Sequence, residues 1–363
     1  MFWIIVFLLM ILFAGIAVIY LTNRFHRFSF MQKLSRKHKI LSWILSLAPV
    51  GVSCLFFLIN TWSVIVVLIH LLIFWIISDF TAFTVRKILK KERRYNIEGV
   101  CAVIITVIVL GAGWHNAHSI SETYYTFSTP KNIEPLRIVG IADAHLGITL
   151  DAEKFAEQIE RINNLNPDIV VIAGDFVDDD STRKDMTETC QSLGNLKTKY
   201  GVYFSYGNHD RGYYNSRDFT FQELETELKK NNVTVLKDES VEINDCFYIT
   251  GRLDNSFEER LDVKDLTENL DISKYNIMLD HQPNDYEKQA EYGVDLVFSG
   301  HTHGGHIFPT GYVGLWAGMN DRVYGTEKRN NTDFVVTSGI SGWAIPFKTG
   351  TKSEIVIMDI VPE

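Results

Sequence analysis

The first 120 residues contain four long runs of apolar residues, and these runs constrain the fold more than any other feature. The first run is apolar over 20 residues, which is enough for a helix that crosses about 30 Å of hydrocarbon. Inside a bilayer no water is present to bond the backbone, so such runs span it as helices. The sequence therefore predicts four membrane-spanning helices, at Phe2–Leu21, Ile40–Ile59, Trp62–Ser78 and Gly99–Trp114.

The charge of the chain divides at the same place. Residues 1–120 carry 12 Lys and Arg against 3 Asp and Glu, whereas residues 121–363 carry 23 against 41. Nearly all the basic side chains of the first part lie in two loops, at 22–39 and 84–98. Both loops fall on the same side of a four-helix arrangement, and cytoplasmic loops are the ones that carry excess Lys and Arg. We therefore expect a multi-pass protein of the cytoplasmic (inner) membrane, with residues 121–363 outside the cytoplasm.

The acidic part begins with a polar segment and then alternates strand and helix patterns. Residues 121–135 contain two prolines and show no periodicity, so we expect a linker there. From residue 136 on, short runs rich in Val, Ile, Phe and Tyr are followed by apolar residues at helical spacing, and nearer the C-terminus by further short strands. The pattern predicts an α/β domain at 136–363, with two β-sheets packed face to face and flanked by helices, behind the membrane domain at 1–120.

Five short polar pieces follow the strand-like runs directly. They are Asp143-Ala144-His145, Gly174-Asp175, Gly207-Asn208-His209-Asp210, His281 and Gly300-His301-Thr302-His303. Side chains at the carboxyl ends of strands converge on one crevice and are held by backbone that is already paired. Two ligands that are two residues apart in extended backbone also point the same way. Together the pieces predict one hydrolytic site that contains two metal ions.

The order and spacing of these pieces resemble the calcineurin-like metallophosphoesterases over about Leu136–Ile360. The tail Gly304-Gly305-His306 and the strand-like run Glu354–Ile360 resemble the membrane-anchored bacterial branch of that family. That branch usually has glutamine at the position of His306, for which a contact with substrate and a structural hydrogen bond both remain open. The resemblance implies a four-layer α/β/β/α sandwich and a phosphoester hydrolase with two divalent metal ions. Mixed Asp, Asn and His ligands favour Mn, Fe or Zn.

The resemblance also implies roles for individual residues. It assigns Asp143, His145 and His303 to one metal, Asn208, His281 and His301 to the other, and Asp175 to both. His209 would protonate the leaving oxygen or bind the phosphate, and Asp178 would orient His209. Asp178 stands in an acidic run with Asp179 and Asp180, so a solvated loop is the alternative for it. Asp179 replaces the arginine of the protein-phosphatase branch, which argues against a phosphoprotein substrate.

These observations favour a membrane-anchored phosphohydrolase that cleaves a phosphoester or pyrophosphate bond by attack of a metal-activated hydroxide. Four helices exceed what anchoring requires, so a lipid-linked or membrane-derived substrate is expected. The alternative is a phosphodiesterase or phosphatase for soluble extracytoplasmic nucleotides or phosphoesters, with the helices as a simple anchor. A non-catalytic membrane sensor is disfavoured by the intact ligand set.

The acidic charge of residues 121–363 argues against nucleic acid as a partner. The sequence indicates no oligomeric state, and it leaves a Cys190–Cys246 disulfide open.

Overall fold

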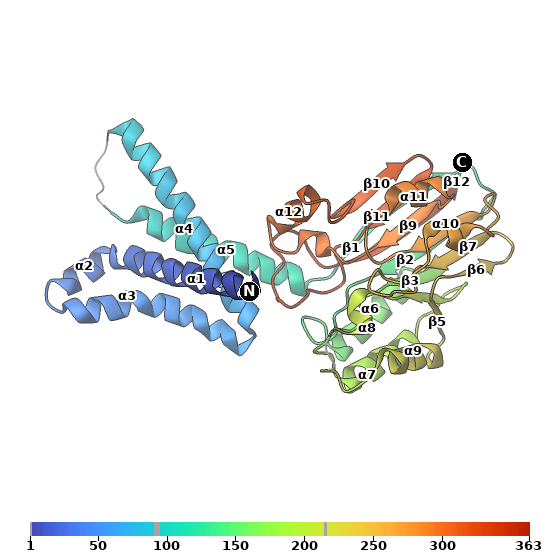
Figure 1. Ribbon diagram of the computed structural model, residues 1–363, viewed down its shortest axis with the longest axis horizontal. Coiled ribbons are helices and arrows are strands. Elements are labelled where there is room, and N and C mark those ends of the chain that lie inside the picture. Colours follow the sequence, from blue (N-terminus) through green and yellow to red (C-terminus); the bar gives the residue numbers. More distant parts are fainter. Residues whose placement is uncertain (1, 91–94, 214–215) are drawn as a thin grey trace. The chain divides into compact units, whose positions relative to one another are not determined.

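The computed structural model describes residues 2–90, 95–213 and 216–363, with side chains of the first helix described from Leu12 on. The chain divides into two compact units, one ending at Ala112 and the other comprising Gly113–Glu363. Figure 1 shows the first unit as helices only and the second as two sheets with helices.

The N-terminal unit consists of apolar helices. They are α1 (Phe2–His26), α2 (Ser29–Ser35), α3 (Lys39–Ser53), the short helix η1 (Cys54–Leu58), α4 (Thr61–Leu89) and most of α5 (Ile97–His118). Among the described residues, three stretches are long and apolar enough to cross a membrane: Lys39–Leu58, Thr61–Leu89 and Ile97–His118. These three confirm the later expected helices. The first expected span, Phe2–Leu21, is helical, but its side chains before Leu12 lie outside the described part, so a fourth span stays a prediction.

Specific contacts hold this helical unit together. Trp75 of α4 is fully buried, and its ring packs edge-on against Phe25 of α1, with ring centroids 4.7 Å apart. Arg24 of α1 and Asp79 of α4 form a partly buried ion pair at 2.6 Å, so the two charges neutralise each other. The side chain of Asn60 accepts a hydrogen bond from the backbone N–H of Ser63 (2.8 Å), which caps the start of α4.

The C-terminal unit is built on two six-stranded mixed sheets. The first has the order β1-β12-β2-β3-β4-β5 and the second β10-β11-β9-β8-β7-β6. The strands of the first sheet are β1 (Ser121–Thr129), β2 (Leu136–Ile141), β3 (Ile169–Ala173), β4 (Val202–Ser205), β5 (Val233–Leu236) and β12 (Glu354–Pro362). Those of the second are β6 (Glu239–Ile243), β7 (Phe247–Gly251), β8 (Tyr275–Leu279), β9 (Leu296–Ser299), β10 (Gly325–Arg329) and β11 (Thr332–Val336). Within the sheets, β2, β3, β4 and β5 are parallel neighbours, as are β7, β8, β9 and β11.

Helices cover the outer face of each sheet. The helices of this unit are α6 (Ala152–Asn164), α7 (Arg183–Leu193), α8 (Asn208–Arg211), α9 (Phe221–Lys230), α10 (Val263–Thr267), α11 (Tyr286–Glu291), η2 (His303–Gly305) and α12 (Thr310–Trp316). Apolar residues of α6, α7 and α9 share one core with the first sheet, and those of α10 and α11 share another with the second. A third core lies between the two sheets. This arrangement confirms the expected four-layer sandwich of two β-sheets flanked by helices.

The alternating pattern of β3 explains how one strand serves two cores. Val170 and Ile172 belong to the core shared with the helices, whereas Ile169 and Val171 belong to the core between the sheets. Successive side chains of a strand point to opposite faces, so a strand buried on both sides reads as a continuous apolar run. This is the run that the sequence shows immediately before Gly174-Asp175.

The segment at 121–135 differs from the expected linker. Its residues Ser121–Thr129 form β1, which pairs in parallel with β12 from Ser121↔Glu354 to Thr129↔Pro362. Strand β1 lies at the edge of the sheet and its middle residues alternate between partly buried and exposed positions. One face of the strand meets solvent, so its sequence contains Thr and Tyr instead of a continuous apolar run. Such a sequence is hard to distinguish from a polar loop. Cys190 and Cys246, for which a disulfide was left open, are both free thiols.

Candidate metal centre

The five polar pieces all lie at the carboxyl ends of parallel strands. Asp143 and His145 follow β2, Asp175 follows β3, and Asn208 opens α8 after β4. From the second sheet, His281 follows β8, and His301 and His303 follow β9. Six of these seven side chains are buried, His301 being the partly exposed one. The two sheets therefore contribute to one site at the edge where their strands end.

The seven side chains form two groups. In the first group, His145 Nε2 lies 3.1 Å from His303 Nε2, which in turn lies 3.8 Å from Asp143 Oδ1. Ligand atoms of these three residues are all within 4.8 Å of one another. Such spacing is close enough for one cation to reach all three.

The second group adjoins the first through Asp175. His301 Nδ1 lies 3.0 Å from Asn208 Oδ1, and the ligand atoms of Asp175, His281 and His301 are within 4.8 Å of one another. Asp175 Oδ2 is 3.1 Å from His281 Nε2 in this group and 3.6 Å from His145 Nε2 in the other. Asp175 thus occupies the position between the groups that a bridging carboxylate requires.

Hydrogen bonds outside the two groups set which ring nitrogen faces inward. His281 Nδ1 lies 2.8 Å from the carbonyl oxygen of Ala173, and His145 Nδ1 lies 2.9 Å from Asp178 Oδ2. Each imidazole donates its Nδ1–H to that acceptor, which leaves the lone pair of Nε2 directed into the site. In the neutral form of His281, its Nε2 and Asp175 Oδ2 then face each other as two acceptors, and the lone pair of His145 Nε2 points toward His303. Acceptors that converge in this way need positive charge between them, so the donor set fits metal ions.

The electrostatics of the site agree with this fit. Burial lowers the pKa of His301 to about 4 and that of His303 well below its usual value, so both rings are neutral near pH 7, as ligands must be. Burial also opposes protonation of His281, but Asp175 and Asp143 raise its pKa well above the usual value. A position where two carboxylates favour a proton this strongly also favours a cation.

Asp178 and His209 form a pair next to the ligand groups. Asp178 is 6% exposed, which excludes the solvated-loop alternative for it, whereas Asp180 is exposed. Asp178 Oδ1 lies 3.0 Å from His209 Nδ1, while its other oxygen contacts His145. Burial would raise the pKa of Asp178, but these two histidines hold it well below the usual value. In return, Asp178 and Asp175 raise the pKa of His209 against the effect of burial. Asp178 is therefore placed to orient both rings.

Much of the site is built from strained backbone. Five of the seven side chains in the two groups belong to residues with positive φ: Asp143 (55°), His145 (37°), Asp175 (50°), His301 (70°) and His303 (49°). A left-handed conformation costs a non-glycine residue on the order of 1 kcal/mol, and it concentrates at functional sites. Glycines allow the close contacts that remain. A Cβ at Gly207 would lie 2.2 Å from Asp175 Oδ1, so only glycine fits there.

Two buried charged residues to which the sequence assigned no role lie beside the two groups. Asp210 is fully buried and accepts hydrogen bonds from the backbone N–H groups of Asp175, Phe176, Val177 and Gly207 at 2.8–3.2 Å. Its place in the Gly207–Asp210 piece was the only signal available. Lys348 is also fully buried, and its Nζ donates to the carbonyl oxygens of Ser338 and Gly339. No local pattern could have indicated Lys348, because it lies in irregular chain.

The ring of His306 lies against the first ligand group. It is 8% exposed and stacks on His303, with ring centroids 5.3 Å apart and an interplanar angle of 25°. Burial, with the charge of Lys348 nearby, lowers the pKa of His306 to about 3. His306 therefore supports the ligand His303 as a neutral ring.

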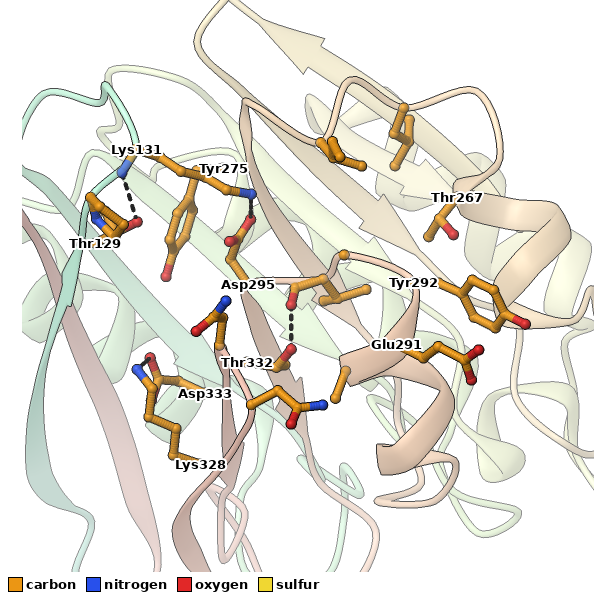
Figure 2. Close-up of a pocket in the computed structure, with 18 of the residues that line it drawn as sticks. Thr129, Lys131, Thr267, Tyr275, Glu291, Tyr292, Asp295, Lys328, Thr332 and Asp333 are labelled. Carbon is orange, nitrogen blue, oxygen red and sulfur yellow. Dashed lines mark hydrogen bonds and ion pairs between the residues drawn. The ribbon is translucent and has the colours of Figure 1, made fainter.

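A separate cavity of about 670 Å³ lies at the other ends of the second sheet's strands (Figure 2). Its lining includes Tyr275 at the start of β8 and Asp295 just before β9. Lys131 pairs with Asp295 at 2.6 Å and Lys328 with Asp333 at 3.3 Å, so these charges neutralise each other across the cavity wall. None of the seven residues of the two groups lines this cavity.

The similarity of this chain to known proteins agrees with the arrangement of the two groups. Residues 136–305 match the family described as calcineurin-like phosphoesterase. The chain is 32% identical over 262 residues to an uncharacterized metallophosphoesterase of Aquifex aeolicus, covering 67% of this chain and 95% of that one. It is 28% identical over 318 residues to an uncharacterized metallophosphoesterase of Campylobacter jejuni, covering 85% and 78% respectively. A transmembrane protein with metallophosphoesterase domain from Danio rerio is 29% identical over 272 residues, covering 70% of this chain and 61% of that protein.

Proposed function

The chain belongs to the calcineurin-like metallophosphoesterases and is a metal-dependent phosphoric ester hydrolase, and from this premise we propose that it cleaves a lipid-linked or membrane-derived phosphoester or pyrophosphate. The observation that carries the proposal is the junction between an apolar helix and the catalytic fold, described below. The same proposal places the catalytic unit on the outer side of the cytoplasmic membrane.

Two divalent cations fit the two ligand groups. Asp143, His145 and His303 would hold one, Asn208, His281 and His301 the other, and Asp175 would hold both. When bound, such a pair supplies a nucleophile at neutral pH and neutralises the oxygens of the phosphoryl group. The mixture of imidazole nitrogen with carboxylate and amide oxygen favours Mn, Fe or Zn. The four imidazoles and the amide are neutral ligands, which leaves the site enough positive charge to bind a phosphate.

His209 is the residue that would give a proton to the leaving oxygen. Burial lowers the pKa of His209, but Asp178, which accepts a hydrogen bond from Nδ1–H, and the nearby Asp175 raise it overall, which favours the protonated ring. The other ring nitrogen is then available to donate to an oxygen of the substrate. Asp178 acts as a positioning residue, because it reaches the reaction only through His209 and His145.

The catalytic unit includes the last turns of α5, and no flexible linker separates them from the fold. The carbonyl oxygen of Gly113 accepts a hydrogen bond from the backbone N–H of Lys348 (2.8 Å), and that of Asn116 accepts one from Ser353 (2.8 Å). The Trp114 ring also packs on Phe347, with centroids 5.5 Å apart. Strand β1 begins at Ser121, three residues after α5 ends. The connection between α5 and the catalytic fold is therefore short. A short connection to a membrane helix favours a substrate that resides in or at the bilayer.

An assay with the full chain in lipid vesicles tests the substrate class. We expect a phosphoester carried by a vesicle lipid to be hydrolysed with a kcat/KM roughly tenfold or more above that of a soluble phosphodiester with the same headgroup, because the tether raises the local substrate concentration. The Asp175→Asn variant in the same vesicles gives the background. Equal or faster hydrolysis of the soluble ester would instead support a hydrolase of soluble extracytoplasmic phosphoesters that uses its helices as an anchor.

Labelling in intact cells tests the orientation. Lys184 has a side chain that is 80% exposed, and we expect Lys184→Cys, combined with Cys246→Ser, to react with a membrane-impermeant maleimide in intact cells. The physical reason is the excess of Lys and Arg in the two loops at 22–39 and 84–98, which favours the cytoplasm for those loops. Reaction only after lysis would place the catalytic unit in the cytoplasm.

A further inference from the structure

The catalytic unit exposes an uncharged segment that the metal centre does not use. Residues 307–319, with the sequence IFPTGYVGLWAGM, contain no Asp, Glu, Lys or Arg, although residues 121–363 together carry a net charge of −18. Large apolar side chains of this segment face solvent: Trp316 is 82% exposed, Met319 67% and Phe308 62%. Helix α12 within it has no buried residue. Packing of the unit therefore does not explain why these positions are apolar.

The aromatic rings of the segment are close neighbours. The rings of Phe308 and Tyr312 are 6.1 Å apart, and those of Tyr312 and Trp316 are 6.4 Å apart. Tyr312 and Trp316 are four residues apart in α12 and therefore lie on the same face of the helix. Phe308 precedes the helix, and its ring packs edge-on against that of Tyr312. These three neighbouring rings form the aromatic face of the segment. Tyr and Trp combine an apolar ring with a polar atom, and they are enriched at the membrane–water interface for that reason.

Three hydrogen bonds connect this segment to the end of α5. The backbone N–H of Phe308 donates to Thr349 Oγ1 (3.1 Å), and that of Gly350 donates to the carbonyl oxygen of His306 (2.9 Å). The neighbouring Lys348 donates its backbone N–H to the carbonyl oxygen of Gly113 in α5 (2.8 Å). Within the catalytic unit, residues 348–350 therefore join the aromatic segment to the last turns of a helix that is apolar enough to cross a membrane.

The segment also borders the chain that carries a ligand. A pocket of about 450 Å³ is lined by Tyr312 and Leu315 of the segment and also by Gly304 and Gly305. Gly304 and Gly305 directly follow the ligand His303. A surface that contacts lipid at Tyr312 would therefore lie next to the edge of the metal centre.

We propose that residues 307–319 form a membrane-contacting surface, whose aromatic face enters the headgroup region of the bilayer that holds the helices. Three observations favour the bilayer over a second protein as the occupant: the absence of charged residues in the segment, the neighbouring Phe, Tyr and Trp rings, and the hydrogen-bonded connection to the end of α5. This inference concerns the position of the catalytic unit and does not rest on the chemical class of the substrate.

Photocrosslinking of the full chain in vesicles tests the proposal. Benzoylphenylalanine is introduced in separate variants at Val313, Trp316, Ile272 and Ile77, and lipid adducts are counted by mass spectrometry after irradiation. Ile272 is the matched control, since it is 73% exposed in the same unit but lies away from the segment, at the cavity of Figure 2. Ile77 in the apolar helix α4 is 53% exposed and sets the yield for a residue that faces lipid.

We expect positions 313 and 316 to give lipid adducts in a yield close to that of position 77 and roughly tenfold above that of position 272, because interfacial apolar side chains meet acyl chains. Yields at 313 and 316 no higher than at 272 would overturn the proposal. So would adducts at 313 and 316 that consist of a second protein chain, which would identify the face as a protein interface.

Discussion

Replacing Asp175 by asparagine is expected to abolish phosphoester hydrolysis and to reduce bound metal. Asp175 Oδ2 is the atom that lies close to both ligand groups, 3.1 Å from His281 Nε2 and 3.6 Å from His145 Nε2. An amide keeps the shape but removes the negative charge that holds two cations together. We expect kcat to fall by on the order of 10³-fold or more, because two-metal sites supply both the nucleophile and the charge neutralisation.

The matched control is Asp180→Asn, which removes the same charge from an exposed position five residues away. It should retain wild-type kcat and metal content. Metal content is measured by inductively coupled plasma mass spectrometry on both variants at equal protein concentration. An Asp175→Asn protein with full activity and unchanged metal would contradict the assignment of the bridging ligand.

Replacing Asp210 by asparagine is expected to cause the largest loss of stability. Asp210 accepts four backbone hydrogen bonds, from Asp175, Phe176 and Val177 on one loop and from Gly207 on the other. In the variant, the amide NH₂ would face N–H donors that have no other acceptor. Breaking a buried charged network of this kind costs about 3 kcal/mol, which corresponds to a fall of roughly 5–10 °C in the melting temperature.

The same substitution should also reduce activity, since the loop that Asp210 holds carries Asp175. Asp218→Asn is the control, because Asp218 also accepts a backbone hydrogen bond, from Arg183 at 2.7 Å, but at an exposed position. We expect that change to alter stability by about 0.5 kcal/mol or less. Differential scanning fluorimetry of the purified chain compares the three proteins. Equal melting temperatures for wild type and Asp210→Asn would show that the network does not stabilise the fold.

The places of the candidate ligands in the fold could be predicted because they depend on local signals. Each of the five pieces follows a run of strand-forming residues, and the end of a strand fixes where the next side chains lie. The apolar helices were predictable for the same reason, since length and hydropathy are properties of a continuous stretch. The strand-like runs before Asp143, Asp175 and His281 therefore indicated the α/β fold, whereas the roles of these residues at the site follow from the family resemblance.

Other features depend on contacts between distant residues and left no local signal. The left-handed backbone at His145 and His303 arises where loops from two sheets meet. Lys348 binds carbonyl oxygens ten and nine residues away in irregular chain. The residues of strand β1 resemble a linker in sequence, because the partner strand, β12, is more than 200 residues away and one face of β1 meets solvent. Periodicity within a short window cannot report such pairings.

Anomalous diffraction from crystals of the full chain grown with manganese tests the central claim most directly. The account predicts two anomalous peaks roughly 3.5–4 Å apart. One should lie among Asp143, His145 and His303 and the other among Asn208, His281 and His301, with Asp175 contacting both. A single peak elsewhere, or no peak in this cluster under saturating manganese, would contradict the two-metal centre.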